Sequence, residues 1–237
     1  MTELYNQDCK ELLKSDAIKD RVDRIIIVTD PPFNIGYHYN TYKDNMVETE
    51  YYMFLKDIFT QYDIPFVCIH YPESIVKLSC YCNMFPEKIV SWVYNSNTAR
   101  QHRDIAFYKV RPDFNAVKQA YKNPNDKRIK QRIADGKGAR LYDWWNINQV
   151  KNVSKNHWGG LKHPCIMPIE VMKNIIGILP KDYIIFDPFM GSGTTGMACK
   201  ELGRDFIGCE IDTEYFEEAK KRLLTEEHQS ITNQLSK

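Results

Sequence analysis

The sequence has no apolar run of the roughly 18 residues that a membrane span needs. It also has no internal repeat and almost no net charge, with 32 Lys and Arg against 31 Asp and Glu. Its first 19 residues contain Asp, Glu, Lys and Asn instead of the basic start and apolar core of a signal peptide. These absences argue against a membrane protein and predict a cytoplasmic one. What is present, 43% hydrophobic and 27% charged among 237 residues, is the composition of a globular chain with a sizeable core.

Cysteine occurs seven times, an odd count, and no CxxC pair is present; only Cys80 and Cys82 lie close together. Disulfide frameworks and zinc sites normally need paired and regularly spaced cysteines. We therefore expect buried reduced thiols and no bound metal.

The small net charge hides two regions of opposite sign. From Arg100 to Lys162 there are 15 Lys and Arg against 5 Asp and Glu, and the rest of the chain has nine more acidic than basic residues. This imbalance predicts contact with nucleic acid, although a solvated charge run stays an alternative. The predicted DNA contacts are Lys127, Arg128, Lys130, Arg132, Lys137 and Arg140, and the basic residues of the whole segment are interleaved with the aromatic residues Trp144, Trp145 and Trp158.

Short apolar segments alternate with segments of helical periodicity. The expected strands are Arg24–Val28, Phe66–Ile69, Lys88–Val93, Tyr183–Phe186 and Phe206–Cys209, and the expected helices are Glu48–Tyr62, Pro168–Leu179, Gly193–Leu202 and Thr213–Leu224. Strand-helix repetition predicts an α/β fold with a doubly wound, Rossmann-like, mostly parallel sheet.

One segment, 111–161, interrupts this alternation because it is rich in Lys, Arg and Asn and poor in apolar residues other than aromatics. We interpret it as a small basic insertion that separates residues 1–110 from residues 162–225 of one domain. The remaining residues, 226–237, read as a polar tail.

A glycine loop, Asp187 to Thr195, lies between an expected strand and an expected helix. Ligands of open α/β sheets bind beyond the carboxyl ends of strands, where glycine lets the backbone approach them. The run G-S-G-T-T-G has the spacing of a dinucleotide motif, and Glu210 could hold a ribose. However, a carboxylate at Asp187 repels a pyrophosphate and attracts an ammonium or sulfonium group. S-adenosylmethionine therefore fits the loop better than NAD.

A second loop, Thr29 to Gly36, follows the strand Arg24–Val28 and begins Thr-Asp-Pro-Pro-Phe. Two successive prolines stiffen its backbone. The Asp30 carboxylate and the Pro31 carbonyl could accept hydrogen bonds from one planar amino group while Phe33 stacks on the attached ring. The loop therefore predicts recognition of the exocyclic amine of a base.

Together, TDPPFNIG (29–36), KHPCIMP (162–168), DPFMGSGTT (187–195) and GCEID (208–212) resemble the S-adenosylmethionine-dependent DNA amino-methyltransferases of restriction-modification systems. These enzymes modify adenine N6 or cytosine N4. The order of the motifs resembles the permuted β group, and the resemblance spans roughly residues 3–224. It implies a sheet of seven strands, base flipping, and conversion of the cofactor to S-adenosylhomocysteine without a metal.

The resemblance also implies roles for individual residues. The catalytic loop would be Asp30, Pro31, Pro32 and Phe33, with Asp30 also near the cofactor. The cofactor would contact Asp8, Cys9, Lys162, His163, Pro164, Asp187, Pro188, Phe189, Gly191, Ser192, Gly193, Thr194, Thr195, Glu210 and Asp212. Asp at position 30 favours adenine N6, whereas Ser there would favour cytosine N4.

Several alternatives stay open. Pro164-Cys165 would supply a nucleophile in a cytosine-C5 methyltransferase, but it lies far in sequence from the strand before the Asp-Pro-Pro-Phe loop, and a packed thiol fits better. RNA or protein-glutamine methylation and a non-catalytic DNA-binding partner are further alternatives. We expect duplex DNA as substrate, a homodimer that extends the short recognition segment, and a cognate restriction endonuclease that acts on the same site.

Overall fold

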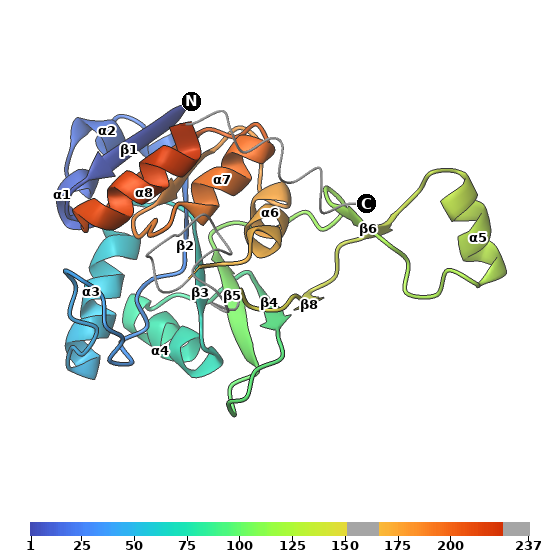
Figure 1. The fold of residues 1–237 in the computed structure, drawn as a ribbon, viewed down its shortest axis with the longest axis horizontal. Helices are drawn as coiled ribbons and strands as arrows, with labels where there is room; N and C mark the ends of the chain where they lie inside the picture. The colour runs from blue at the N-terminus through green and yellow to red at the C-terminus, as the bar shows by residue number, and fades with distance from the viewer. Residues whose placement is uncertain (151–165, 225–237) are drawn as a thin grey trace.

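The computed structural model describes residues 1–150 and 166–224. In this part of the chain a sheet forms the central layer (Figure 1). It has eight strands in the order β1-β10-β9-β2-β3-β5-β4-β8. The strands are β1 (Thr2–Asn6), β2 (Ile25–Thr29), β3 (Phe66–His70), β4 (Lys88–Val93), β5 (His102–Tyr108), β8 (Trp144–Asn146), β9 (Ile184–Asp187) and β10 (Phe206–Glu210). The Rossmann-like α/β prediction is confirmed, with eight strands where the resemblance implies seven.

All five strands expected from the sequence form and run in the same direction, and the strand that runs opposite to them is β5. It pairs in antiparallel register with both β3 and β4, whereas β4 and β8 are parallel. The physical reason is the connection between β4 and β5, residues 94–101, which is too short for the crossover that parallel neighbours need. The sequence analysis also missed β5, whose first three residues are polar.

Helices cover both faces of the sheet. They are α1 (Cys9–Leu13), α2 (Asp16–Lys19), α3 (Glu48–Thr60), α4 (Pro72–Cys82), α6 (Ile169–Gly177), α7 (Thr194–Glu201) and α8 (Thr213–Leu224), with a 3-10 turn at Val22–Arg24. Side chains alternate between the faces of a strand. Accordingly Ile25 and Ile27 pack in one core with α1, α3 and α4, whereas Ile26 and Val28 pack in the other with α6, α7 and α8.

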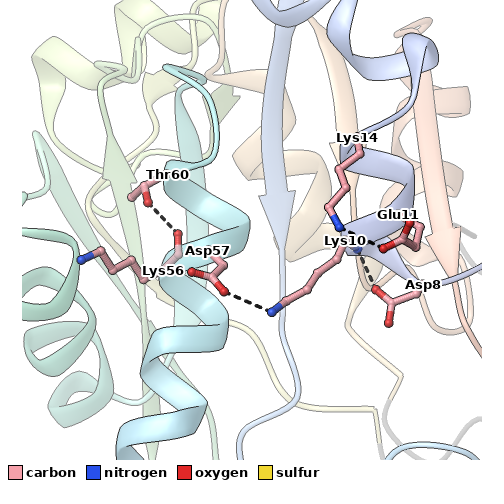
Figure 2. A network of polar contacts seen from close by, with 7 residues as sticks. All are labelled: Asp8, Lys10, Glu11, Lys14, Lys56, Asp57 and Thr60. Atoms are coloured by element: carbon pink, nitrogen blue, oxygen red, sulfur yellow. Dashed lines mark hydrogen bonds and ion pairs between the residues drawn. The ribbon is translucent and has the colours of Figure 1, made fainter.

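The first helix is fixed against α3 just after β1 ends. Lys10 Nζ lies 3.1 Å from Asp57 Oδ2 of α3, and the Lys10 backbone N–H donates to Asp8 Oδ1 at 2.7 Å (Figure 2). The ion pair is exposed and contributes little to stability. Burial of Leu12 and Leu13, which are at most 1% exposed, holds the helix in place. Asp8 is thereby positioned at the carboxyl edge of the sheet.

The predicted insertion contributes to the sheet as well as to the surface. Its strand β8 pairs with β4, so that Trp145 is buried while Trp144 is 48% exposed. A two-stranded ribbon, β6 (Lys118–Gln119) with β7 (Ala139–Arg140), carries α5 (Lys127–Ala134) away from the body (Figure 1). No residue of α5 is buried. We call residues 118–140 the arm.

Within residues 1–150 and 166–224, no helix has the length and hydrophobicity to cross a membrane.

The topology places two loops side by side. Strands β2 and β9 are parallel neighbours, yet the helices that follow them, α3 and α7, pack on opposite faces of the sheet. The segments that follow the carboxyl ends of β2 and β9 therefore diverge. A crevice at such a point is where open α/β sheets bind ligands.

Candidate functional site

A cavity of about 670 Å³ lies at this edge of the sheet. Both loops singled out in the sequence line it, together with residues that follow β1 and β10. The predicted site residues in its wall are Asp8, Cys9, Asp30, Pro31, Pro32, Phe33, Asp187, Pro188, Phe189, Gly191, Ser192, Thr194, Thr195, Glu210 and Asp212. The sequence therefore identified residues that the fold brings together from four separate strand ends.

Four predicted residues stand apart from this set. Lys162, His163 and Pro164 lie outside the described residues, as do Cys165 and Trp158. Gly193 is described but is not among the residues that line the cavity. It adopts a φ of +78°, and a Cβ there would lie 3.1 Å from the Ala219 side chain of α8. Its position indicates a role in turning the glycine loop into α7 and packing that helix against α8.

Asp187 organises the glycine loop from the tip of β9. Its Oδ1 accepts hydrogen bonds from the Thr29 hydroxyl at 2.7 Å and from the Phe189 N–H at 3.1 Å. Its Oδ2 accepts from the Thr195 hydroxyl at 2.5 Å. Burial raises the pKa of Asp187 to about 6, against the lowering effect of these three donors. The carboxylate therefore fixes both loops and gives the cavity a negative wall.

Glu210 and Asp212 extend this negative wall beyond β10. Glu210 Oε2 accepts from the Gly191 N–H at 3.0 Å, and Oε1 accepts from the Asp212 N–H at 2.8 Å. Burial raises the pKa of Glu210 to about 7. Each carboxylate oxygen has a second lone pair, so both can accept a further hydrogen bond from a ligand hydroxyl.

Asp30 leaves an acceptor unmet. Its Oδ2 lies 3.5 Å from Nη1 of Arg103, while Oδ1 is buried and has no hydrogen-bond partner within residues 1–150 and 166–224. Burial raises the pKa of Asp30 to about 6, with Arg103 lowering it and Asp187 raising it. A buried acceptor without a partner is costly, and a donor on a ligand would satisfy it.

Two side chains that the sequence analysis missed hold the Asp-Pro-Pro-Phe loop. The Tyr71 N–H donates to Nδ1 of His70 at 2.8 Å, and the Tyr51 hydroxyl donates to the Pro32 carbonyl at 2.6 Å. The Tyr51 oxygen also lies 2.8 Å from Nε2 of His70, which must therefore carry the proton and donate it. Burial is the main reason that the pKa of His70 falls to about 3, so the ring is neutral. It also stacks on Phe33, with centroids 4.4 Å apart.

The chain after Phe33 is a second feature that sequence reasoning missed. Asp44 is 2% exposed and accepts hydrogen bonds from the backbone N–H groups of Asn34, Ile35 and Tyr37 at 2.7 to 3.0 Å. One carboxylate therefore folds the loop 34–46. Farther along it, the Thr41 hydroxyl donates to Asp212 Oδ2 at 2.6 Å and ties the loop to the end of β10. The clustered tyrosines of G-Y-H-Y-N-T-Y (36–42) were the available signal, and three of them line the cavity.

The predicted site residues Asp8 and Cys9 line the cavity at the start of α1. Asp8 caps α1 through its 2.7 Å hydrogen bond with the Lys10 N–H, and Cys9 is 6% exposed. Nearby, Phe54 and Phe189 lie with their ring centroids 5.8 Å apart, and Lys10 Nζ is 5.0 Å from the Phe54 centroid. These groups offer apolar ring surface with a polar rim, which suits a planar heterocycle.

The six predicted DNA contacts are all exposed and do not line the cavity. Four of them lie on α5, and Lys137 and Arg140 follow on the returning side of the arm. Aromatic side chains accompany the charge, since Arg132 Nε donates to the Tyr121 hydroxyl at 2.8 Å. Lys122 Nζ also lies 5.3 Å from the centroid of Trp144. The arm therefore presents cations to solvent, with the partly buried ring of Tyr121 among them and the exposed ring of Trp144 on β8 beside them.

The cavity suits a nucleoside that carries a cationic amino acid. Asp187 and Glu210 supply acidic side chains whose oxygens accept hydrogen bonds, the Phe54 and Phe189 pair supplies ring surface, and Asp30 supplies a further carboxylate. Among the residues that the structure describes, no group of three or more His, Cys, Asp or Glu side chains is arranged to hold a metal ion.

Comparison with known proteins places these features in a family. Residues 25–221 match the N6/N4 DNA methylase family. The chain is 30% identical to the Type II methyltransferase M.HpaI of Haemophilus parainfluenzae, over 92% of this chain and 75% of that protein.

Solved structures share the fold. The crystal structure of an M1.HpyAVI–SAM complex has a TM-score of 0.59 and 24% identity, covering 94% of this chain and all of that one. The cytosine-N4-specific PvuII DNA methyltransferase has a TM-score of 0.66 and 18% identity, covering 95% and 87% of the two chains. From the family match and the relationship to M.HpaI, this chain belongs to the N6/N4 DNA methylase family.

Proposed function

We propose that the protein transfers a methyl group from S-adenosylmethionine to the exocyclic N6 amine of an adenine flipped out of duplex DNA. The observation that carries the proposal is the Asp30 carboxylate in the cavity wall, on a loop of two prolines, whose Oδ1 has no hydrogen-bond partner within residues 1–150 and 166–224. Chemistry on an exocyclic amine inside a duplex is sterically blocked, so the base has to leave the stack.

The cofactor would lie between the ends of β1, β9 and β10. Glu210 would accept hydrogen bonds from the ribose hydroxyls, and Asp8 and Cys9 would lie against the adenine ring. Asp187, Phe189, Gly191 and Thr194 would surround the methionine part, together with Lys162, His163 and Pro164. When bound, S-adenosylmethionine supplies an electrophilic methyl group on its sulfonium centre.

The target base would enter the space bounded by Phe33, Tyr71 and Arg103, which all line the cavity. An amine attached to an aromatic ring is a poor nucleophile because its lone pair is delocalised into the ring. Hydrogen bonds to Asp30 and to the Pro31 carbonyl favour a tetrahedral nitrogen whose lone pair is available for bond formation. The contribution of these residues is positioning and electrostatic stabilisation.

The arm would hold the duplex while the base is in the cavity. Its exposed Lys and Arg side chains suit phosphate groups, and Asn, Gln and Arg in the same segment can read base edges.

We further propose a homodimer, because a single short arm covers little of a duplex. We also propose a cognate restriction endonuclease. Sedimentation that shows only a monomer, with and without DNA, would contradict the dimer.

Cytosine N4 is the second candidate, because the PvuII enzyme of similar fold is cytosine-N4-specific and either amine suits the same loop. The two are distinguished by incubating the protein with unmethylated DNA and labelled S-adenosylmethionine, followed by mass spectrometry of the nucleosides. We expect N6-methyldeoxyadenosine, with the rate reduced at least about 100-fold in Asp30→Ala. Label on N4-methyldeoxycytidine would support the second candidate, and no label on any DNA would contradict both.

A further inference from the structure

Arg103 is the cation in contact with Asp30, and no motif in the sequence pointed to it. It lies on β5, on the sheet face opposite to His70, because His70 pairs with Asp104 and side chains alternate along the strand. Its guanidinium carbon is 4.5 Å from the Phe33 centroid, 5.4 Å from that of Trp92 and 5.9 Å from that of Tyr71.

These rings hold the guanidinium in place. The Arg103 side chain is 16% exposed, and a planar cation that stacks on aromatic rings in such a site gains cation–π stabilisation. Arg103 and His70 approach the Phe33 ring from opposite faces of the sheet. Arg103 is therefore part of the wall beside the catalytic loop and is not a mobile surface side chain.

We propose that Arg103 is a positioning residue for methyl transfer: its guanidinium beside Oδ2 orients the Asp30 side chain and keeps it a carboxylate that can accept a hydrogen bond from the target amine. This inference rests on the proposed function for its catalytic part. The geometry supports this role, since Nη1 of Arg103 lies 3.5 Å from Oδ2 of Asp30, while the buried Oδ1 has no hydrogen-bond partner within residues 1–150 and 166–224.

The surroundings of Asp30 explain why a nearby cation is needed to keep this side chain ionised. Burial and the negative charge of Asp187 at the end of β9 both favour the protonated acid, whereas Arg103 favours the carboxylate. Cys68 of β3 and Tyr94 after β4 also interact electrostatically with Asp30, and burial raises the pKa of each. A protonated Asp30 would lose acceptor capacity toward an amine.

The test uses full-length protein with ¹³C-labelled aspartate carboxyls, in which the Asp30 signal is identified by its absence from Asp30→Asn. Arg103→Met keeps the aliphatic stem and removes the charge, Arg103→Lys keeps a cation, and Arg103→Gln replaces the Met variant if that does not fold. Arg100→Met is the matched control, since Arg100 pairs with Glu73 at 3.1 Å and stacks on Tyr71.

We expect the pKa of Asp30 to rise in Arg103→Met or Arg103→Gln, and to stay near the wild-type value in Arg103→Lys and Arg100→Met. On DNA, kcat should fall at least about tenfold in the uncharged variants and recover in part in Arg103→Lys, with the Kd for S-adenosylmethionine unchanged. An Asp30 pKa that does not move when the charge is removed would overturn the proposal. Because the titration needs neither DNA nor turnover, it is read independently of whether the protein methylates adenine.

Discussion

The Thr29 hydroxyl donates a hydrogen bond of 2.7 Å to Asp187 Oδ1, and this bond joins two loops that are 158 positions apart in the chain. Thr29 is the last residue of β2 and immediately precedes the proposed amine acceptor Asp30. Asp187 holds the glycine loop through Thr195 and Phe189. The regions proposed to hold the target base and the cofactor are thus linked through one buried carboxylate, which fixes their relative position.

Replacing Thr29 by Val removes this bond while keeping the shape of the side chain. A buried carboxylate that loses a donor costs about 1.5 to 3 kcal/mol, so urea unfolding should shift to lower concentration. The Kd for S-adenosylmethionine, measured by calorimetry, should rise several-fold because the glycine loop is less ordered. Thr60→Val is the control, since the Thr60 hydroxyl bonds the Lys56 carbonyl within α3. Equal cofactor affinity in the Thr29 and Thr60 variants would contradict this role.

Cofactor affinity should depend on pH through Glu210. Burial raises the pKa of this carboxyl to about 7, so the acceptor for the ribose hydroxyls is lost by protonation as the pH falls through that value. Binding should therefore weaken toward acidic pH in the wild type. Glu210→Gln should bind weakly with a flatter pH profile, whereas Glu201→Gln, which alters a surface pair with Lys173, should follow the wild type. A wild-type Kd that stays constant across this range would refute the assignment.

Tyr51→Phe should make the Asp-Pro-Pro-Phe loop less ordered without changing the affinity for the cofactor. The variant removes the hydrogen bond to the Pro32 carbonyl and leaves Nε2–H of His70 without its acceptor. We expect a loss of about 1 to 3 kcal/mol in unfolding free energy and a several-fold lower kcat at unchanged cofactor affinity. Tyr62→Phe, at the end of the α3 region, is the matched control. If kcat stays at the wild-type value in the Tyr51 variant, the position of the loop during catalysis does not depend on the Tyr51 hydrogen bonds.

DNA affinity should depend steeply on salt through the arm. Replacing Lys127, Arg128, Lys130 and Arg132 by Gln should lower the slope of log affinity against log salt by about 0.9 for each phosphate contact that is lost. Fluorescence anisotropy with labelled duplexes measures this slope. The control carries Gln at four exposed lysines on the body: Lys14, Lys19, Lys181 and Lys220. Equal slopes in both quadruple variants would remove the arm from the interface.

The sequence was most informative where local chemistry determines the structure. Apolar runs predicted five strands, and the stiff or glycine-rich loops after β2 and β9 were found because Pro and Gly act on their own backbone. Their convergence followed from a general property of parallel sheets, namely that carboxyl ends share an edge. Residues that line the cavity were predictable where they belong to the loops that follow β1, β2, β9 and β10.

What escaped prediction depends on partners distant in the chain. Arg103 is an ordinary charged residue until β5 brings it to Asp30, and His70 reads as the polar end of a buried strand until Tyr51 of α3 meets it. Asp44 looks like a surface carboxylate, although three backbone N–H groups turn toward it. Strand β5 begins with three polar residues, so its hydrophobic pattern was too short to detect.

Methyl transfer to adenine is tested by expressing the protein in a host without DNA methylation and sequencing the genome by a method that resolves modified bases. We predict N6-methyladenine at one short recurring sequence, and none when Asp30→Ala is expressed at the same level. Modification at cytosine N4 would contradict the assignment to adenine. A genome without modified bases, from cells that contain folded protein, would contradict methyl transfer to DNA altogether.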